Sequence, residues 1–183
     1  MEDKAALQES KERYGRLFIN DIDKIDCAIF DPSVGVVGQS WYVDITVAGL
    51  LDANGFVYDF SHLKKLVKQV LKSTVDHALV IPVQSKLVHY QETERGELWR
   101  LQAKSRLTGV NSDWSYLCPK GAAYPMRAVQ VTRELIEAEC SRLIRHRLPE
   151  EISSVEVHLR KEEVISGQSF FRYSHGITGH EGL

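Results

Sequence analysis

Asp76 and His77 are the residues of this sequence whose types and adjacency best suit acid–base chemistry. A histidine titrates near neutral pH, and a neighbouring carboxylate can fix its tautomer and raise its basicity. A structural interpretation competes with this one, because His77 follows a stretch of helical periodicity and a cation at a helix end is stabilised by the carbonyl dipoles. On these residues alone both interpretations stay open.

The three cysteines indicate neither a disulfide framework nor a classical zinc finger. Cys27, Cys118 and Cys140 are odd in number, far apart and without Cys-x-x-Cys spacing. Cys27 falls in a strand-like run, and Cys140 lies on the apolar face of a predicted helix. We therefore expect Cys27 to belong to the core and the Cys140 thiol to be inert.

An amphipathic helix is predicted around residues 63–71, just before the Asp-His pair. Apolar residues recur at i, i+3, i+4, i+7 and i+8, with lysines on the opposite face, and Ser61 or Asp59 is a candidate cap. The lysines suit an anion-binding stripe, but we favour a solvated face. The apolar positions are Leu63, Leu66, Val67, Val70 and Leu71, and the lysines are Lys64, Lys65, Lys68 and Lys72.

Strands are predicted on both sides of this helix. Residues 17–30 and 41–47 are strand-like, and the second run alternates apolar and polar residues with period two. Proline and glycine in 31–35 supply a turn between them. Residues 155–160 alternate clearly, and 169–174 form a further strand-like run.

The remaining segments complete the order of elements. Residues 128–148 predict a second helix, which ends before Pro149, and 78–125 read as a hairpin-bearing insertion. Strands grouped in hairpins around a helix pair favour an α+β domain with an antiparallel sheet over a doubly wound parallel sheet.

Length and composition exclude several classes of protein. With 183 residues, 43% of them hydrophobic and 26% charged, the chain fits one globular domain. A net charge of -2 gives no electrostatic footprint for nucleic acid or anionic lipid. No apolar run approaches the roughly 20 residues of a membrane span, and residues 1–16 are too charged for a signal peptide. We expect a cytoplasmic protein with neither nucleic-acid nor membrane partners.

Three consecutive motifs resemble the family of 6-pyruvoyl-tetrahydropterin and 6-carboxytetrahydropterin synthases. They are Trp-Tyr-Val-Asp-Ile-Thr-Val at 41–47, Gly-Phe-Val-Tyr-Asp-Phe-Ser-His-Leu-Lys-Lys-Leu at 55–66 and Val-Asp-His at 75–77. Val-Thr-Arg-Glu-Leu-Ile at 131–136 is a weaker match to the start of the family's second helix. The resemblance covers about residues 20–77 and 125–165.

The resemblance implies the tunnelling fold, or T-fold, of that family. An antiparallel four-stranded sheet would carry two helices on one face, with the hairpin-bearing insertion between the helices. Residues 1–16 would be a charged N-terminal extension, and 17–168 a single T-fold domain with its insertion at about 78–125. Such domains assemble into barrels, which implies a homo-oligomer and removes exposed sheet edges.

The resemblance also assigns chemistry to particular positions. Asp76 and His77 match a pair that relays protons near a catalytic cysteine, and zinc is expected from the family, held by three histidines. The family's His-Gly-His-Ser is here Val-Gly-Gln-Ser at 37–40, and 26–31 contains no histidine. Valine offers no lone pair and glutamine is a poor zinc ligand, so we expect no three-histidine site there. The loop nucleophile is missing as well, because Cys27 lies within the strand.

Two further positions follow from the resemblance. Glu162, or Glu163 beside it, stands nearest the glutamate that holds the edge of the pterin ring. Residues 169–183 resemble the opening strand of a second T-fold half, in which His175 would be the first zinc ligand. The chain would then be the N-terminal half of a tandem protein, or a natural short form without the metal.

Three hypotheses for function result. The first is a synthase-like domain acting on 7,8-dihydroneopterin triphosphate or a related pterin. The second is a catalytically silent T-fold module that binds a pterin or purine, or only assembles with active subunits; the substitutions at 37–40 favour it for this chain alone. The third, an unrelated α+β binding domain, is disfavoured by the motif at 55–66.

Overall fold

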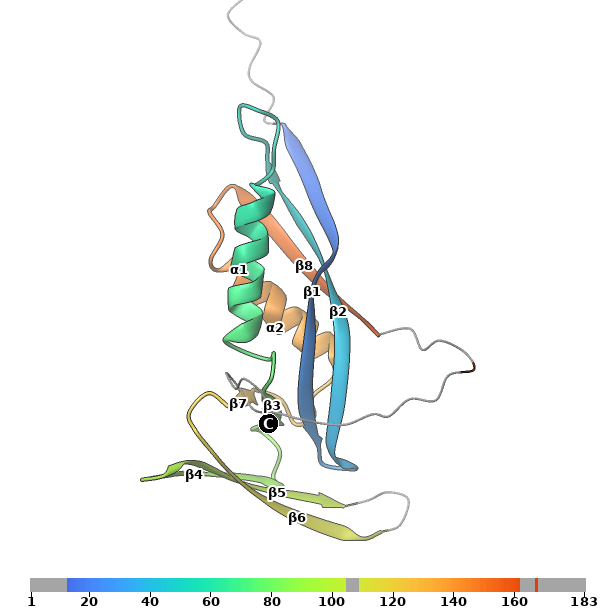
Figure 1. The fold of residues 1–183 in the computed structure, drawn as a ribbon, viewed down its shortest axis with the longest axis vertical. Helices are drawn as coiled ribbons and strands as arrows, with labels where there is room; N and C mark the ends of the chain where they lie inside the picture. Colours follow the sequence, from blue (N-terminus) through green and yellow to red (C-terminus); the bar gives the residue numbers. More distant parts are fainter. Residues whose placement is uncertain (1–12, 105–108, 162–166, 168–183) are drawn as a thin grey trace, which may run out of the picture.

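The structure, a computed structural model, describes residues 13–104, 109–161 and 167. A long antiparallel hairpin spans most of its long axis (Figure 1). Its strands are β1 (Tyr14–Asp31) and β2 (Gly35–Leu50), paired from Tyr14 opposite Leu50 to Asp31 opposite Gly35. The two strands predicted at 17–30 and 41–47 are therefore confirmed. The hairpin already begins at Tyr14, inside the segment 1–16 expected to precede the domain.

The tip of this hairpin is fixed by its turn residues. The Asp31 carboxylate accepts hydrogen bonds from the backbone N–H and the hydroxyl of Ser33, at 2.7 and 2.6 Å. Gly35 has φ +107°, and a Cβ there would lie 2.6 Å from the Trp114 ring. Glycine is needed on both grounds, since side-chain residues rarely adopt this φ and the ring leaves no room for a side chain.

Helix α1 (Phe60–Lys72) follows the hairpin and confirms the predicted amphipathic pattern. Asp59 is the cap, because its carboxylate accepts from the His62 backbone N–H at 2.7 Å, whereas Ser61 lies inside the helix. Leu63, Val67, Val70 and Leu71 are buried. Their burial against the hairpin stabilises the helix far more than intrinsic propensity does.

Two short parallel strands enlarge the main sheet beyond the prediction. β3 (Leu79–Pro82) pairs in parallel with β1, and β7 (Ala123–Met126) pairs in parallel with β3. The sheet therefore has five strands in the order β7-β3-β1-β2-β8, and it is mixed rather than the expected four-stranded antiparallel sheet. The expectation was wrong because both short strands come from the region assigned to the insertion. The strand expected at 169–174 lies outside the described residues.

The rest of the insertion forms a separate antiparallel sheet. Its strands are β4 (Val88–Thr93), β5 (Gly96–Lys104) and β6 (Asn111–Cys118), in the order β4-β5-β6. Figure 1 shows this second sheet at one end of the molecule, beyond β3 and β7. A hairpin-bearing insertion is thus confirmed, and it packs on the first sheet through a hydrophobic cluster around Phe30 of β1 and Trp99 and Leu101 of β5.

Helix α2 (Arg133–Arg145) and strand β8 (Ile152–Lys161) complete the first sheet and its cover. The helix is shorter than the predicted 128–148, because Thr132 caps it by accepting from the Leu135 N–H at 3.3 Å. Beyond its C-terminal end the chain turns at Pro149 into β8. No helix in the described part of the chain is long and apolar enough to cross a bilayer.

The two helices cover one face of the sheet, as predicted (Figure 1). Trp41, Val43, Ile45 and Val47 alternate along β2 and are buried with the apolar residues of both helices. On the other face, Ala28 and Phe30 of β1 pack against the second sheet, whereas the area around Asp44 of β2 is polar. There Arg160 of β8 donates to the Asp44 carboxylate at 2.5 Å, and its guanidinium lies 5.8 Å from the centre of the Tyr42 ring.

Candidate functional site

Asp76 and His77 lie in the loop that joins α1 to β3, and this loop is held against β1. The His77 backbone N–H donates to the Asp26 carbonyl at 2.7 Å. The Asp26 backbone N–H donates in turn to the Asp76 carboxylate at 3.2 Å. The backbone carbonyl and N–H of Asp26 therefore both bond to the Asp-His pair, although Asp26 and Asp76 are 50 residues apart in the sequence.

The backbone of His77 adopts an unusual conformation. Its φ is +57°, in the left-handed region, which costs a residue with a Cβ roughly 1 kcal/mol or more. The hydrogen bond from the His77 N–H to the Asp26 carbonyl helps to hold this backbone conformation. Strained residues of this kind cluster at functional sites, which makes the loop a site candidate.

Asp76 is buried and His77 is accessible, which gives the pair unequal environments. The Asp76 side chain is 9% exposed and the His77 side chain 44%, with 3.7 Å between Oδ1 of Asp76 and Nε2 of His77. Burial raises the pKa of Asp76, while the Asp26 N–H and the charge of His77 act in the opposite direction. A buried carboxylate beside a half-exposed imidazole is a suitable arrangement for orienting the ring and for exchanging protons with a ligand.

Asp26 extends this site onto the first hairpin. Asp26 of β1 and Ser40 of β2 are register partners, and the Ser40 hydroxyl donates to the Asp26 carboxylate. Asp26 was not identified from the sequence, although it holds both Asp76 and His77. No local pattern signals this role, because it depends on a contact between β1 and a distant loop.

Val37 and Gln39, where the resemblance implies zinc histidines, lie on β2 opposite residues of β1. Cys27 lies opposite Gln39, and Ile29 lies opposite Val37, so these four residues form two adjacent cross-strand pairs. Side chains of residues i and i+2 share a face, and both pairs lie on the helix-covered face with Trp41. We name these residues, Cys27, Ile29, Val37 and Gln39, the quartet.

The donor atoms of the quartet do not fit a zinc ion. Two of its members are aliphatic, and the amide of Gln39 is a weak ligand beside imidazole or thiolate. Cys27 is the one strong donor, yet burial, with smaller contributions from Asp76 and Asp26, raises its pKa to about 12. Within the described residues, no three His, Cys, Asp or Glu side chains are grouped to hold a metal. The expectation that Cys27 belongs to the core is confirmed, since it is 2% exposed.

The other thiols are no better suited to nucleophilic chemistry. Cys140 is fully buried in α2, and burial raises its pKa to about 12. Cys118 lies in the second sheet, where burial raises its pKa to about 11. A thiolate is the reactive form of cysteine, so neither residue is activated as a nucleophile.

Glu162 and His175, the other two site residues suggested by the sequence, lie outside the described residues. β8 ends at Lys161, directly before Glu162, and it pairs with β2 up to Lys161 opposite Trp41. The structure therefore brings together Asp76, His77 and the quartet, and leaves the roles of Glu162 and His175 as predictions.

Comparison with known proteins identifies relatives of the chain. The sequence family described as 6-pyruvoyl tetrahydropterin synthase matches residues 34–169. Among solved structures, a 6-pyruvoyltetrahydropterin synthase from Plasmodium vivax superposes with a TM-score of 0.62 at 21% identity, covering 81% of this chain and 92% of that chain. The corresponding protein of Plasmodium falciparum gives 0.62 at 19% identity, covering 81% and 91%. A search of curated proteins finds no significant match.

Proposed function

The chain belongs to the 6-pyruvoyl tetrahydropterin synthase family, and on that premise we propose that it binds a pterin-type small molecule beside Asp76 and His77 without zinc-dependent chemistry of its own. The observation that carries this proposal is the quartet. Cys27, Ile29, Val37 and Gln39 occupy the hairpin where the family resemblance places zinc ligands, and they offer no set of donors for zinc.

The Asp76–His77 pair supports the binding half of the proposal. A half-exposed imidazole donates to or accepts from a heterocycle, and the buried carboxylate 3.7 Å from it favours the protonated ring. The backbone of His77 has a strained φ of +57°. Such strain is consistent with a loop that positions a ligand.

A second candidate function is a synthase-type enzyme acting on 7,8-dihydroneopterin triphosphate or a related pterin. The specific observation in its favour is the same pair, since a carboxylate and an imidazole 3.7 Å apart are suited to proton relay. This candidate requires that a metal and a nucleophile come from residues outside the described ranges or from another chain.

The test is a binding and turnover experiment on protein treated with chelator. We expect 7,8-dihydroneopterin triphosphate to bind with the same affinity before and after chelation, without turnover. His77→Ala should weaken binding about tenfold, as expected for the loss of one hydrogen bond to a partly buried ligand group. The matched control is His158→Ala, which removes an exposed histidine of β8. This variant should bind the pterin with the affinity of the unmodified chain.

Two results would overturn the proposal. About one tightly bound zinc per chain together with turnover would establish the enzyme candidate instead. Absence of pterin binding in folded protein would leave a module that only assembles with other subunits.

A further inference from the structure

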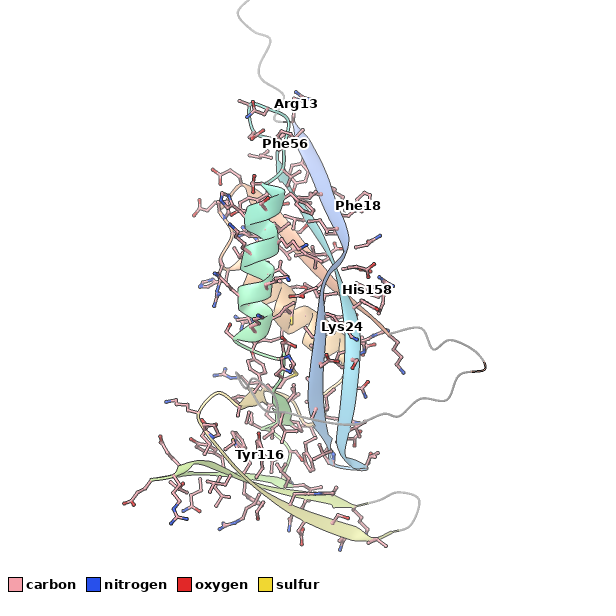
Figure 2. All side chains as sticks on the ribbon, viewed as in Figure 1. Arg13, Phe18, Lys24, Phe56, Tyr116 and His158 are labelled. Atoms are coloured by element: carbon pink, nitrogen blue, oxygen red, sulfur yellow. The ribbon has the colours of Figure 1, made fainter. Side chains whose placement is uncertain are left out.

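The second sheet carries an ordered set of cross-strand pairs on the face that looks toward the first sheet. Val88 lies opposite Leu101, Tyr90 opposite Trp99, and Glu92 opposite Glu97. Alternation along a strand puts these three pairs on one face, apolar at one end, aromatic in the middle and acidic at the other end. Figure 2 shows Tyr116 on the same side of the sheet, where it is the β6 partner of Trp99.

A cavity of about 400 Å³ opens between this face and the edge of the first sheet. Its lining residues come from both sheets: Val83 follows β3, Pro125 belongs to β7, and Val88, Tyr90, Glu97 and Trp99 belong to the second sheet. The Tyr90 and Trp99 rings lie 4.7 Å apart at 50° to each other, and Tyr90 is 50% exposed. The volume is suitable for a small organic molecule.

Two polar features in and beside this cavity lack partners within the described part of the chain. Trp99 is 4% exposed, and its indole N–H makes no hydrogen bond there. A buried donor without an acceptor is costly, but this N–H has almost no accessible surface, so an acceptor in the cavity reaches it only when a side chain of the cavity wall moves. The indole of Trp41 is also without a partner, but Trp41 does not line the cavity.

The second feature is a pair of like charges. Glu92 and Glu97 face each other across β4 and β5, and no described cation forms an ion pair with either of them. Directly opposed like charges destabilise a strand pair. Desolvation raises the pKa of the Tyr90 hydroxyl, and the charges of Glu92 and Glu97 raise it further, so both carboxylates act on the aromatic wall.

We propose that this cavity binds a small organic ammonium ion that also carries a hydrogen-bond acceptor. The cation lies against the Tyr90 ring, where the ring quadrupole attracts it, and close to the Glu97 carboxylate, which offsets its charge. The acceptor takes the hydrogen bond of the Trp99 indole once a side chain of the cavity wall moves aside. Each unsatisfied feature of the cavity is thereby matched by one part of the ligand.

The probe for this proposal is acetylcholine, which has a quaternary ammonium group and an ester acceptor. Its neutral isostere, 3,3-dimethylbutyl acetate, keeps the shape and the ester but has no charge, and tetramethylammonium keeps the charge without the acceptor. The full chain labelled with 5-fluorotryptophan has three tryptophans, so it gives three fluorine resonances, assigned by single Trp→Phe replacements.

We expect acetylcholine to shift the Trp99 resonance saturably and to leave that of Trp41 unchanged. The neutral isostere and tetramethylammonium should each bind about fivefold more weakly or worse. Glu97→Gln should weaken acetylcholine binding by a similar factor. Glu94→Gln makes the same change of charge in the adjacent turn, outside the cavity lining, and should have no such effect.

The proposal is overturned if the neutral isostere binds as well as acetylcholine, because the site would then be merely apolar. It is also overturned if no resonance shifts at tens of millimolar while all three remain dispersed as in folded protein. If Glu97→Gln and Glu94→Gln weaken acetylcholine binding equally, the weakening comes from the net charge of the surface. That result would contradict the proposed site.

Discussion

Asp76 carries a burial cost that should be measurable as a dependence of stability on pH. Its carboxyl is enclosed between α1 and β1, and burial raises its pKa above the ordinary value of 3.8. The native state therefore holds the Asp76 proton more tightly than the unfolded chain does. The resulting stabilisation is fully present below the unfolded pKa and is lost as the pH rises through the folded pKa.

Asp76→Asn removes this dependence, because an amide does not ionise while its oxygen can still accept from the Asp26 N–H. The free energy of unfolding of the variant, minus that of the unmodified chain, should increase from about pH 4 toward neutrality and then level off. Urea denaturation at closely spaced pH values measures it.

The control for this prediction is Asp113→Asn, which changes the same chemical group at an exposed position of β6. Its difference in unfolding free energy should stay constant over the range. The prediction is contradicted if the difference for Asp76→Asn is equally flat or falls as the pH rises. Burial would then not raise the pKa of Asp76 in the native state.

At the scale of elements, α2 is docked on β8 by side chains that bond to the strand's backbone. The Leu159 N–H donates to the Glu137 carboxylate at 2.7 Å, and the Val157 N–H donates to the Ser141 hydroxyl at 2.8 Å. These two amides point away from β2. Helix side chains therefore satisfy donors that an edge strand would otherwise leave exposed.

Glu137→Ala should destabilise the protein by about 1–3 kcal/mol, because it leaves the Leu159 N–H without an acceptor in a partly buried place. Glu137→Gln should recover much of this loss, since its amide oxygen still accepts. Thermal or urea unfolding of both variants measures the difference. Equal destabilisation by the two would assign the effect to the ion pairs of Glu137 with Arg133 and His158 instead.

At the scale of the whole molecule, β1 presents a long edge to its surroundings. In the described structure β3 pairs with β1 only at Ala28 and Ile29, so the edge from Tyr14 to Ile25 has no described strand beside it on that side. Tyr14 and Phe18 are 57% and 71% exposed on this stretch. Figure 2 shows Phe18 on the side of β1 away from α1. We propose that this edge pairs with another copy of the chain, which makes the protein a homo-oligomer.

Phe18→Lys should weaken this association, because a charge on an edge strand opposes pairing. Light scattering on eluted protein should show a multiple of the 20.8 kDa chain for the unmodified protein and smaller species for the variant at micromolar concentration. Leu117→Lys, at a 49% exposed position on the second sheet, is the matched control and should keep the size of the unmodified protein. A monomeric unmodified chain would contradict the proposal.

The sequence by itself determined the elements whose signals are local. Alternation of apolar residues gave β2 and β8, because one face of each is buried. The i, i+3, i+4 pattern gave α1, although the choice of Asp59 over Ser61 as its cap came from the structure, and the motif around Asp76 and His77 gave the candidate site. The lack of histidine at Val37 and Gln39, where the family resemblance implies zinc ligands, was likewise visible in the sequence.

Only the tertiary structure decided how distant segments meet. β3 and β7 join the main sheet in parallel, although each is only four residues long and uniformly or irregularly buried, so neither has a clear period. The strand register sets Cys27 opposite Gln39, and the Asp26 N–H donates to the Asp76 carboxylate. Both depend on contacts between residues far apart in the sequence. A strand's hydrogen bonds do not depend on the side chains of its partner, and so the sequence records which residues are buried but not which strand lies beside them.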